Sequence, residues 1–177
     1  MNGVYLKGEQ NGWDKEPRVW LNLRRPFSKE FQLRKENEWP LAGTNWTKLF
    51  LDAKTGSLDW RAPAAEGTAS FAALGDGVKW MSPPLEHETE ITGPMALKLY
   101  LSSSTTDADL FVTVLAFSPD GREVEFQGTV DPHTPLAQGW LRASHRRLDP
   151  KKSRPYGPTT RTTISNRSSR IRQGYRI

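Results

Sequence analysis

Apolar and polar residues alternate in several short stretches of this chain, which is the pattern of a β-strand with one buried and one wet face. The clearest stretch is residues 95–101, where every second residue is Met or Leu and the residues between include a Lys and a Tyr. Residues 18–23 alternate in the same way, and residues 46–51 are rich in apolar and aromatic residues. We therefore predict a strand in each of these three stretches.

A β-hairpin is the second feature that the pattern predicts. Residues 110–117 are apolar at nearly every position, which indicates a strand buried on both faces. The sequence Pro-Asp-Gly follows at 119–121, where proline presets the first turn dihedral and glycine accepts the positive φ of a reversing chain. After this turn, Val124 and Phe126 alternate with charged residues, as expected of the returning strand.

The rest of the chain gives shorter signals. Further short strands are predicted at residues 31–33, around Leu58, at residues 70–71 and at residues 139–145. A short helix is expected to end at Gly8. Short strands separated by Gly- and Pro-rich turns are typical of an all-β sandwich, which is the fold class we predict.

Size and composition narrow the class of protein. The 177 residues suit one domain with a sizeable core, and the absence of Cys excludes disulfides and thiolate metal sites. The chain opens with no charged-then-apolar leader and has no apolar run long enough to span a membrane. We therefore expect a cytoplasmic protein without a membrane partner.

The positive charge is concentrated at the C-terminal end. Eight of the 25 Lys and Arg residues and no acidic residue lie in 151–177, which leaves 17 basic against 20 acidic residues before that point, a net charge of −3. The main body therefore has no nucleic-acid footprint. The basic tail is poor in large aliphatic residues, so we expect 151–177 to be disordered. Its charge could attract nucleic acid or an anionic membrane, but it lacks the apolar face of an amphipathic helix, and a non-functional readthrough peptide explains it at least as well.

Several motifs resemble one family of enzymes. They are EITGP at 90–94, SSSTTDADLFV at 102–112, PDG at 119–121, FQG at 126–128 and QGWLRASHR at 138–146. This part of the chain resembles the C-terminal domain of the X-prolyl dipeptidyl-peptidase and cocaine-esterase family of serine hydrolases. Two earlier segments, LKGEQNGWDKEPRV at 6–19 and ENEWPLAGTNWTKLFLD at 36–52, resemble the junction with the hydrolase domain and the start of this domain's sheet.

The resemblance implies a jelly-roll β-sandwich, similar to galactose-binding domains, packed against an α/β-hydrolase domain in cis or in trans. It implies three parts: residues 1–16 as a remnant of the junction, 17–150 as the jelly roll, and 151–177 as the tail. Family activities are dipeptide release after proline and hydrolysis of esters or acyl amides. The catalytic serine, aspartate and histidine of such enzymes lie upstream of this domain, and no G-x-S-x-G nucleophile elbow occurs here.

The expected function is therefore that of a non-catalytic domain supporting the hydrolase domain and its active-site entrance. We expect a gene fragment whose sandwich is incomplete at its C-terminal end. The alternative is a stand-alone β-sandwich that binds carbohydrate or protein, which rests on the fold alone.

The three histidines are weak candidates for a catalytic base. His87 lies among glutamates in a polar segment, and His133 lies in a Pro-containing loop. His145 follows Ser144, but neighbouring strand residues point to opposite faces and so do not form a nucleophile–base pair. We predict no catalytic residue in this chain.

Acidic residues are the remaining candidates for metal or acid–base chemistry. Asp107 and Asp109 have the spacing that begins a calcium loop, but further carboxylates are missing nearby, so we expect them to satisfy turn amides. The glutamates at 36, 38 and 86–90 lie in polar connectors without a predicted apolar pocket, so we read them as solvated charge. No metal or cofactor is expected.

Candidate interdomain contacts are predicted in the connectors and near the end of the jelly roll. We expect most tryptophans to anchor the core and loops. Trp39 and Trp80 lie in irregular connectors, where sandwich domains make contacts, and tryptophan favours interfaces. Arg142 and His145 are predicted to donate hydrogen bonds across the same interface.

Overall fold

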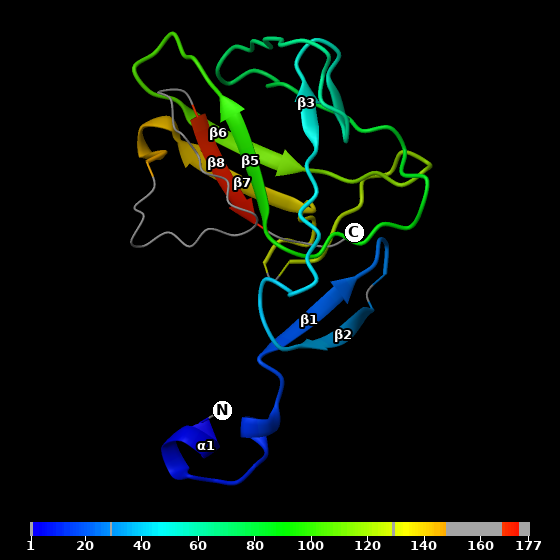
Figure 1. The fold of residues 1–177 in the computed structure, drawn as a ribbon, viewed down its shortest axis with the longest axis vertical. Coiled ribbons are helices and arrows are strands. Elements are labelled where there is room, and N and C mark those ends of the chain that lie inside the picture. Colours follow the sequence, from blue (N-terminus) through cyan, green and yellow to red (C-terminus); the bar gives the residue numbers. More distant parts are fainter. Residues whose placement is uncertain (1, 29, 129, 148–167, 174–177) are drawn as a thin grey trace. The chain divides into compact units, whose positions relative to one another are not determined.

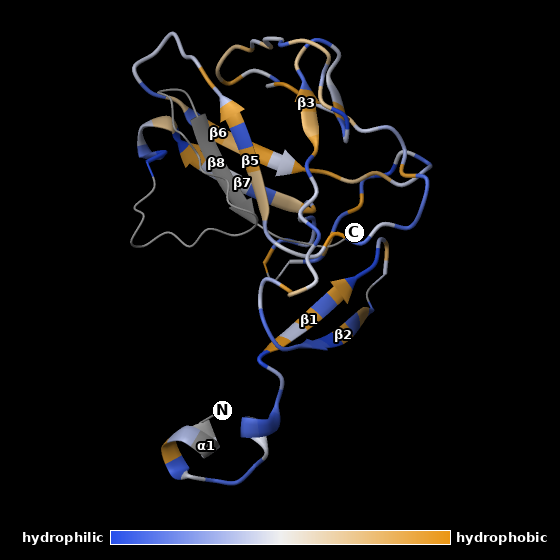
Figure 2. Cartoon of the chain, in the orientation of Figure 1, coloured by the Kyte–Doolittle hydropathy of each residue, from blue (hydrophilic) through white to orange (hydrophobic). Residues whose placement is uncertain are grey.

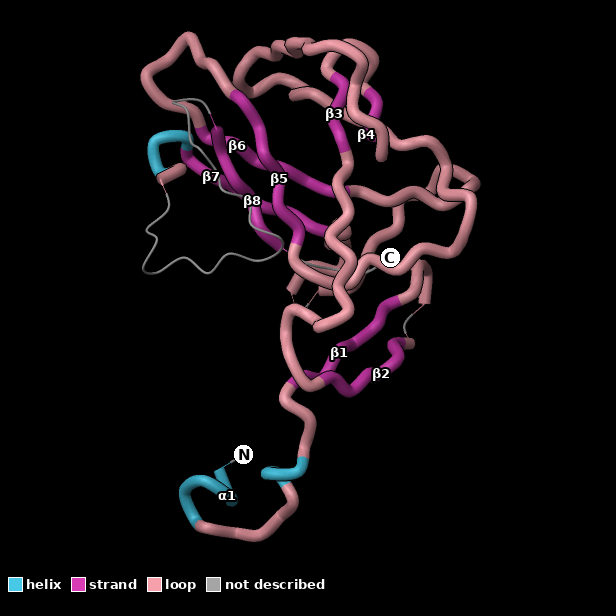
Figure 3. The backbone as a smooth tube through the Cα atoms, in the orientation of Figure 1, coloured by secondary structure: helices cyan, strands magenta, loops and turns pink. Residues whose placement is uncertain are grey.

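The all-β prediction is confirmed by the structure, a computed structural model that describes residues 2–28, 30–128, 130–147 and 168–173. Strands and connecting loops make up nearly all of the described chain (Figure 3). The chain divides into two compact units: Met1–Thr44 with Ile91–Ile177, and Asn45–Glu90. The junction expected at residues 1–16 and the start of the sandwich at residue 17 therefore lie within one unit.

The first unit begins with the predicted short helix. Helix α1 spans Asn2–Lys7, and Gly8 follows it with a φ of 68°. Glycine adopts this left-handed conformation without a Cβ clash, and such a residue commonly ends a helix. A 3₁₀ turn, η1, follows at Trp13–Lys15.

An antiparallel ribbon follows, formed by β1 (Val19–Arg24) and β2 (Phe31–Glu36). Exposed and less exposed residues alternate along β1, as predicted, and Figure 2 shows the matching alternation of polar and apolar residues. Strand β2 is longer than the three residues expected. Arg24 fixes the end of the ribbon: its Nη1 donates to the Gln127 carbonyl oxygen at 3.1 Å, and its guanidinium lies 5.9 Å from the centre of the Phe126 ring.

Strand β5 (Met95–Tyr100) confirms the clearest prediction, because its residues alternate in exposure along the whole strand. It pairs in antiparallel fashion with β8 (Ser168–Gln173), and so differs from the disordered tail expected for 151–177. Ladder hydrogen bonds come from backbone groups, so a segment poor in aliphatic residues can still pair with a strand edge. The rest of that tail lies outside the described residues.

Strands β6 (Asp109–Val114) and β7 (Ala137–Arg142) form the third antiparallel pair described in this unit. The predicted burial of β6 on both faces is wrong: Leu110 is 8% exposed, whereas its neighbour Phe111 is 78% exposed. Alternate residues of a strand point to opposite faces, and only one face of this pair is covered. The strand predicted at 139–145 exists but starts earlier, and it ends in a 3₁₀ turn, η2 (Ala143–His145).

The core of this unit lies beside the predicted hairpin. Val124, Phe126 and Leu136 form a buried cluster. The turn at 119–121 forms as predicted, with Gly121 at a φ of 81° and its N–H donating to the Ser118 carbonyl oxygen at 2.8 Å. The returning segment is held by isolated bridges, Phe117 to Glu123 and Phe126 to Thr134, rather than by a continuous strand. Three partly buried side chains pack against the cluster: Met95, Val114 and Ala116.

The second unit is a small hairpin with long loops. Strands β3 (Phe50–Asp52) and β4 (Ser57–Asp59) pair in antiparallel fashion, so the strand predicted at 46–51 is shorter and the one near Leu58 is confirmed. A carboxylate oxygen of Asp52 accepts a hydrogen bond from the Lys54 N–H at 2.8 Å and stabilises the turn. No strand forms at residues 70–71, which lie in an exposed loop without a pairing partner in the described chain.

Candidate interdomain contact surface

The serine and histidine nearest to each other in sequence do not form a catalytic pair. Ser144 and His145 lie in η2 rather than on a strand, so the geometric reason given for excluding them does not apply. Instead, the Ser144 hydroxyl donates to Asp107 Oδ2 at 2.6 Å, and the Ser144 N–H donates to Asp107 Oδ1 at 2.9 Å. A nucleophilic serine gives its proton to a histidine ring, and this hydroxyl is bound to a carboxylate.

Asp107 accepts hydrogen bonds from backbone amides, as the sequence predicted, whereas Asp109 binds the Arg142 side chain instead of a turn amide. The Ser144 hydroxyl lowers the pKa of Asp107, and the backbone N–H of Ala108 contributes in the same direction. Arg142 lowers the pKa of Asp109 by donating from Nε and Nη2 to its two carboxylate oxygens, each at 2.8 Å. In turn, Asp109 raises the pKa of Arg142. The two aspartates therefore clamp β6 to β7 and η2.

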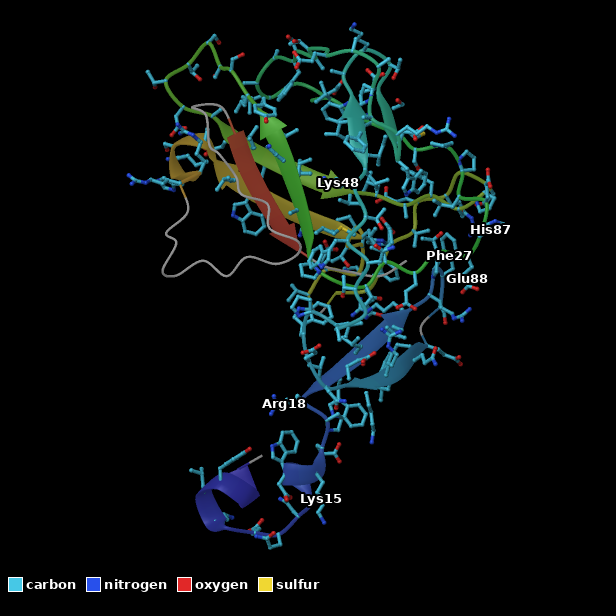
Figure 4. All side chains as sticks on the ribbon, viewed as in Figure 1. Lys15, Arg18, Phe27, Lys48, His87 and Glu88 are labelled. Carbon is cyan, nitrogen blue, oxygen red and sulfur yellow. The ribbon has the colours of Figure 1, made fainter. Side chains whose placement is uncertain are left out.

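The other two histidines are also placed away from catalytic geometry. His87 is exposed in the second unit, next to Glu88 in a loop (Figure 4). The His133 ring lies 2.7 Å from a carboxylate oxygen of Glu125, which raises the pKa of His133. Within residues 2–147, leaving out 29 and 129, and within 168–173, no three His, Cys, Asp or Glu side chains gather as metal ligands.

The outer surface of β6 and β7 carries two exposed aromatic rings. Phe111 and Trp140 are directly paired in the register of the two strands and are 78% and 65% exposed. Asp109 and Arg142 form the next pair on the same face of the sheet. Each lies two residues along its strand from one of the rings, and residues two apart on a strand point to the same face. We call this surface the β6–β7 face; its members are Asp109, Phe111, Thr113, Gln138, Trp140 and Arg142.

This aromatic pair was missed from the sequence. Phe111 was predicted to be buried, and Trp140 was assigned with most tryptophans to core and loop anchoring. The signal that could have found it is the alternation Asp-Leu-Phe-Val-Thr-Val in β6, which puts Phe111 on the same face as Asp109 and Thr113.

The four predicted contact residues do not form one surface. Arg142 and His145 lie close together at the end of β7 and in η2, and both are exposed. Trp39 is partly exposed in the loop after β2, whereas Trp80 belongs to the second unit. Trp80 is half-buried, and its Nε1 donates to the Asp52 carbonyl oxygen at 3.1 Å, so it anchors the hairpin of that unit.

A shallow pocket lies near the N-terminal end. It has a volume of about 380 Å³ and is lined by Asn11, Trp13, Glu16 and Trp20. Trp20 already has a partner on β2, because the Lys35 ammonium lies 4.7 Å from the centre of its ring. The pocket is open to solvent and contains one acidic group, so it offers no enclosed acid–base pair.

Comparisons with known proteins identify the family. The model of the X-Pro dipeptidyl-peptidase C-terminal non-catalytic domain matches residues 11–168. Two putative serine esterases, from Mycobacterium bovis and Mycobacterium tuberculosis, are each 33% identical over 69 residues, which is 39% of this chain and 9% of theirs.

Solved structures cover much more of the chain. Two crystal structures of a CocE/NonD family hydrolase from Staphylococcus aureus match 99% of this chain, with TM-scores of 0.81 and 0.79 and identities of 26% and 25%. This chain spans about a third of their length, 34% and 33%. The described residues contain no helix that is long and apolar enough to cross a membrane.

The β-sandwich predicted from the sequence is the fold of this family, whereas the finer likeness to galactose-binding domains stays a prediction. The match covers most of the chain, and the β1–β2 and β6–β7 pairs of the first unit lie within it. This chain belongs to the family of X-Pro dipeptidyl-peptidase C-terminal non-catalytic domains.

Proposed function

We propose that this domain supports the hydrolase domain of a serine hydrolase and helps to form the entrance of its active site. The observation that carries the proposal is the extent of the structural match: 99% of this chain corresponds to 34% of a CocE/NonD family hydrolase. The remaining two-thirds of that hydrolase has no counterpart here. A non-catalytic domain of this family therefore acts beside a catalytic part that another segment or another chain supplies.

The chemistry of the described residues supports a structural role. Ser144 is bound to Asp107, and His133 is bound to Glu125, so these polar groups stabilise turns and strand ends. Arg142 and His145 remain our candidates for hydrogen bonds to the hydrolase domain, since both are exposed near the end of β7. Trp39 and Trp80 remain candidates on the two units.

The substrate is the part of the proposal that depends most on the catalytic partner. Family resemblance supports dipeptide release after proline or hydrolysis of esters and acyl amides. Both reactions use an acyl-enzyme formed by an activated serine, and the hydrolase domain would supply that serine. The role of this domain is to shape access to it.

A domain exchange tests the proposal. The segment of the Staphylococcus aureus hydrolase that matches this chain is replaced by residues 1–177, and ester and X-Pro-nitroanilide turnover are measured. We expect the chimera to retain at least about a tenth of the parent activity and to unfold in one transition, because a supporting domain of the same fold re-forms the contact. A chimera with turnover no higher than a heat-treated control, whose two parts unfold independently, would contradict the proposal.

A further inference from the structure

We propose that the β6–β7 face, centred on Phe111 and Trp140, is the surface through which this domain docks onto the catalytic part of its hydrolase. This inference rests on the proposed function and adds the place of contact. The two rings lie opposite each other in the strand register, on the side facing away from the buried Leu110 and Ala137.

The exposure of these rings calls for a partner. Phe111 is 78% exposed and Trp140 is 65% exposed, although residues next to them in the chain are buried or half-buried. Each aromatic side chain removes about 150–250 Å² from water when it is covered. Paired exposed aromatic residues on a sheet face are typical of interaction sites, and tryptophan is enriched among the residues that dominate binding energy.

The two charged residues beside the rings are already paired. Arg142 donates two hydrogen bonds to Asp109, so this part of the rim carries a cation and an anion that neutralise each other. Covering an unpaired charge costs far more than covering a paired one. The face is therefore suited to an apolar patch with a polar edge, rather than to a highly charged surface such as nucleic acid.

The clamp between β6, β7 and η2 holds the face in one geometry. Asp107 accepts hydrogen bonds from the backbone and the hydroxyl of Ser144, which ties the segment before β6 to the turn after β7. The Ala143 N–H also donates to the Ala108 carbonyl oxygen at 2.8 Å. A surface fixed in this way loses little conformational freedom on binding, which favours a stable contact.

The occupant follows from the size of the relatives. A domain of this family is the C-terminal part of a longer protein, and in the solved hydrolases about two-thirds of the chain lies beyond the matching part. A stable contact buries about 800 Å² on each partner. Phe111 and Trp140 supply the centre of such an area, and the catalytic part supplies the surface that covers them.

The β1–β2 ribbon, where exposed aromatic residues also gather, is a weaker candidate. On the β1–β2 ribbon, Trp20 is stacked by Lys35 of the same ribbon, and Phe27 is stacked by Arg122 at 4.6 Å from its ring centre (Phe27 is labelled in Figure 4). These rings already have partners within the chain. No cation of the described residues stacks on Phe111 or Trp140.

The test uses the chimera and a double substitution, Phe111→Ser with Trp140→Ser. The matched control is Tyr100→Ser, because Tyr100 is 69% exposed on β5, outside the β6–β7 face. The rate of proteolysis at the junction between the two parts reports how often they separate. Truncating two central contact residues should raise this rate at least about tenfold, and the control should leave it within about twofold of the unsubstituted chimera.

The isolated 177-residue chain separates docking from folding. Because both rings are exposed, the double substitution should leave the melting temperature of the isolated chain within a few degrees of the unsubstituted value. The inference is overturned if the chimera carrying the double substitution is cleaved no faster than the control, while the unsubstituted chimera is active and unfolds as one body. In that outcome the proposed function stands. It is also overturned if the double substitution abolishes dimers of the isolated chain without changing the chimera, since the occupant would then be a second copy.

Discussion

Asp109 and Arg142 lie opposite each other across β6 and β7, with two N–H···O hydrogen bonds of 2.8 Å between the guanidinium and the carboxylate. A bidentate pair fixes the relative position of the two strands, which a single ammonium group cannot do. It also places a neutralised charge pair at the rim of the exposed aromatic rings. The local geometry of the proposed contact surface therefore depends on this pair.

Replacing Arg142 by Lys is expected to distinguish the effect of the positive charge from the effect of the bidentate hydrogen bonds to Asp109. The positive charge remains, but the fork that reaches both oxygens of Asp109 is lost. In the chimera we expect junction proteolysis to rise about two- to fivefold, less than for the aromatic double substitution. Replacing Arg146 by Lys is the control, because the Arg146 Nη1 donates to the Ala143 carbonyl oxygen of its own turn and not to a carboxylate across the strands. Equal effects of the two substitutions would contradict the role given to the pair.

Acid is expected to destabilise the domain through its turn and strand carboxylates. The Ser118 hydroxyl and then Arg122 lower the pKa of Asp120 from its ordinary value to about 2. A lowered pKa stabilises the folded state above the unfolded pKa, and this contribution is lost as pH falls from about 4 to about 2. Asp120→Asn should therefore flatten the decrease of melting temperature between pH 4 and pH 2. An unchanged pH profile would show that the turn contacts do not stabilise the fold.

The pair formed by His133 and Glu125 is expected to have the opposite pH dependence, so that its contribution to stability is lost as pH rises. Glu125, hydrogen-bonded to the ring, raises the pKa of His133 above its ordinary value. A raised pKa stabilises the folded state fully below the unfolded pKa, and the contribution disappears as pH rises through the folded value. NMR titration of the ring should show the raised pKa and its decrease in Glu125→Gln. A pKa of His133 that is the same in both proteins would contradict the contact.

The buried cluster gives the strongest stability prediction. Leu136 is 1% exposed, so Leu136→Ala should lower the free energy of unfolding by about 2–5 kcal/mol through lost burial and a residual cavity. Leu33→Ala is the matched control, because Leu33 is exposed on β2 and should cost less than about 1 kcal/mol. Urea unfolding of the isolated chain measures both. Similar losses for the two substitutions would place the core elsewhere.

The turn at 119–121 predicts that replacing Gly121 by Ala costs more stability than replacing Gly43 by Ala. Gly121 has a φ of 81° and no atom within 4 Å of an added Cβ, so Gly121→Ala is strained by the backbone alone and should cost about 1 kcal/mol. Gly43 has equal space for a Cβ but no positive φ, so Gly43→Ala should be neutral or slightly stabilising. Thermal melts of the two variants would coincide if the turn had another conformation.

The strands were predictable where one face of the chain packs on the core. In β1 and β5 the alternation of exposure follows the alternation of apolar residues, so the period of two was enough to locate both. In β6 the same reasoning failed, because Phe111 is apolar and yet lies on the outer face. Hydrophobicity predicts burial only where another part of the same chain covers the apolar side chain. On a contact surface, apolar side chains stay exposed until a partner covers them.

The polar contacts show a second limit of the sequence. Asp107 accepts from the neighbouring Ala108 N–H, as predicted, but the other partners of the two aspartates, Ser144 and Arg142, are more than 30 residues away. Only the pairing of β6 with β7 brings these residues together. Motifs therefore identified the family and the fold class, while the contact surface required the register of the strands.

The most direct measurement of the central account is turnover by the purified 177-residue chain alone. Acyl-ester and X-Pro-nitroanilide substrates are tested against a heat-treated sample, with Ser144→Ala as a second reference. A supporting domain without its catalytic part should give no rate above the heat-treated sample, and the substitution should change nothing. A rate above that background that disappears in Ser144→Ala would contradict the account, because the domain would then carry chemistry of its own.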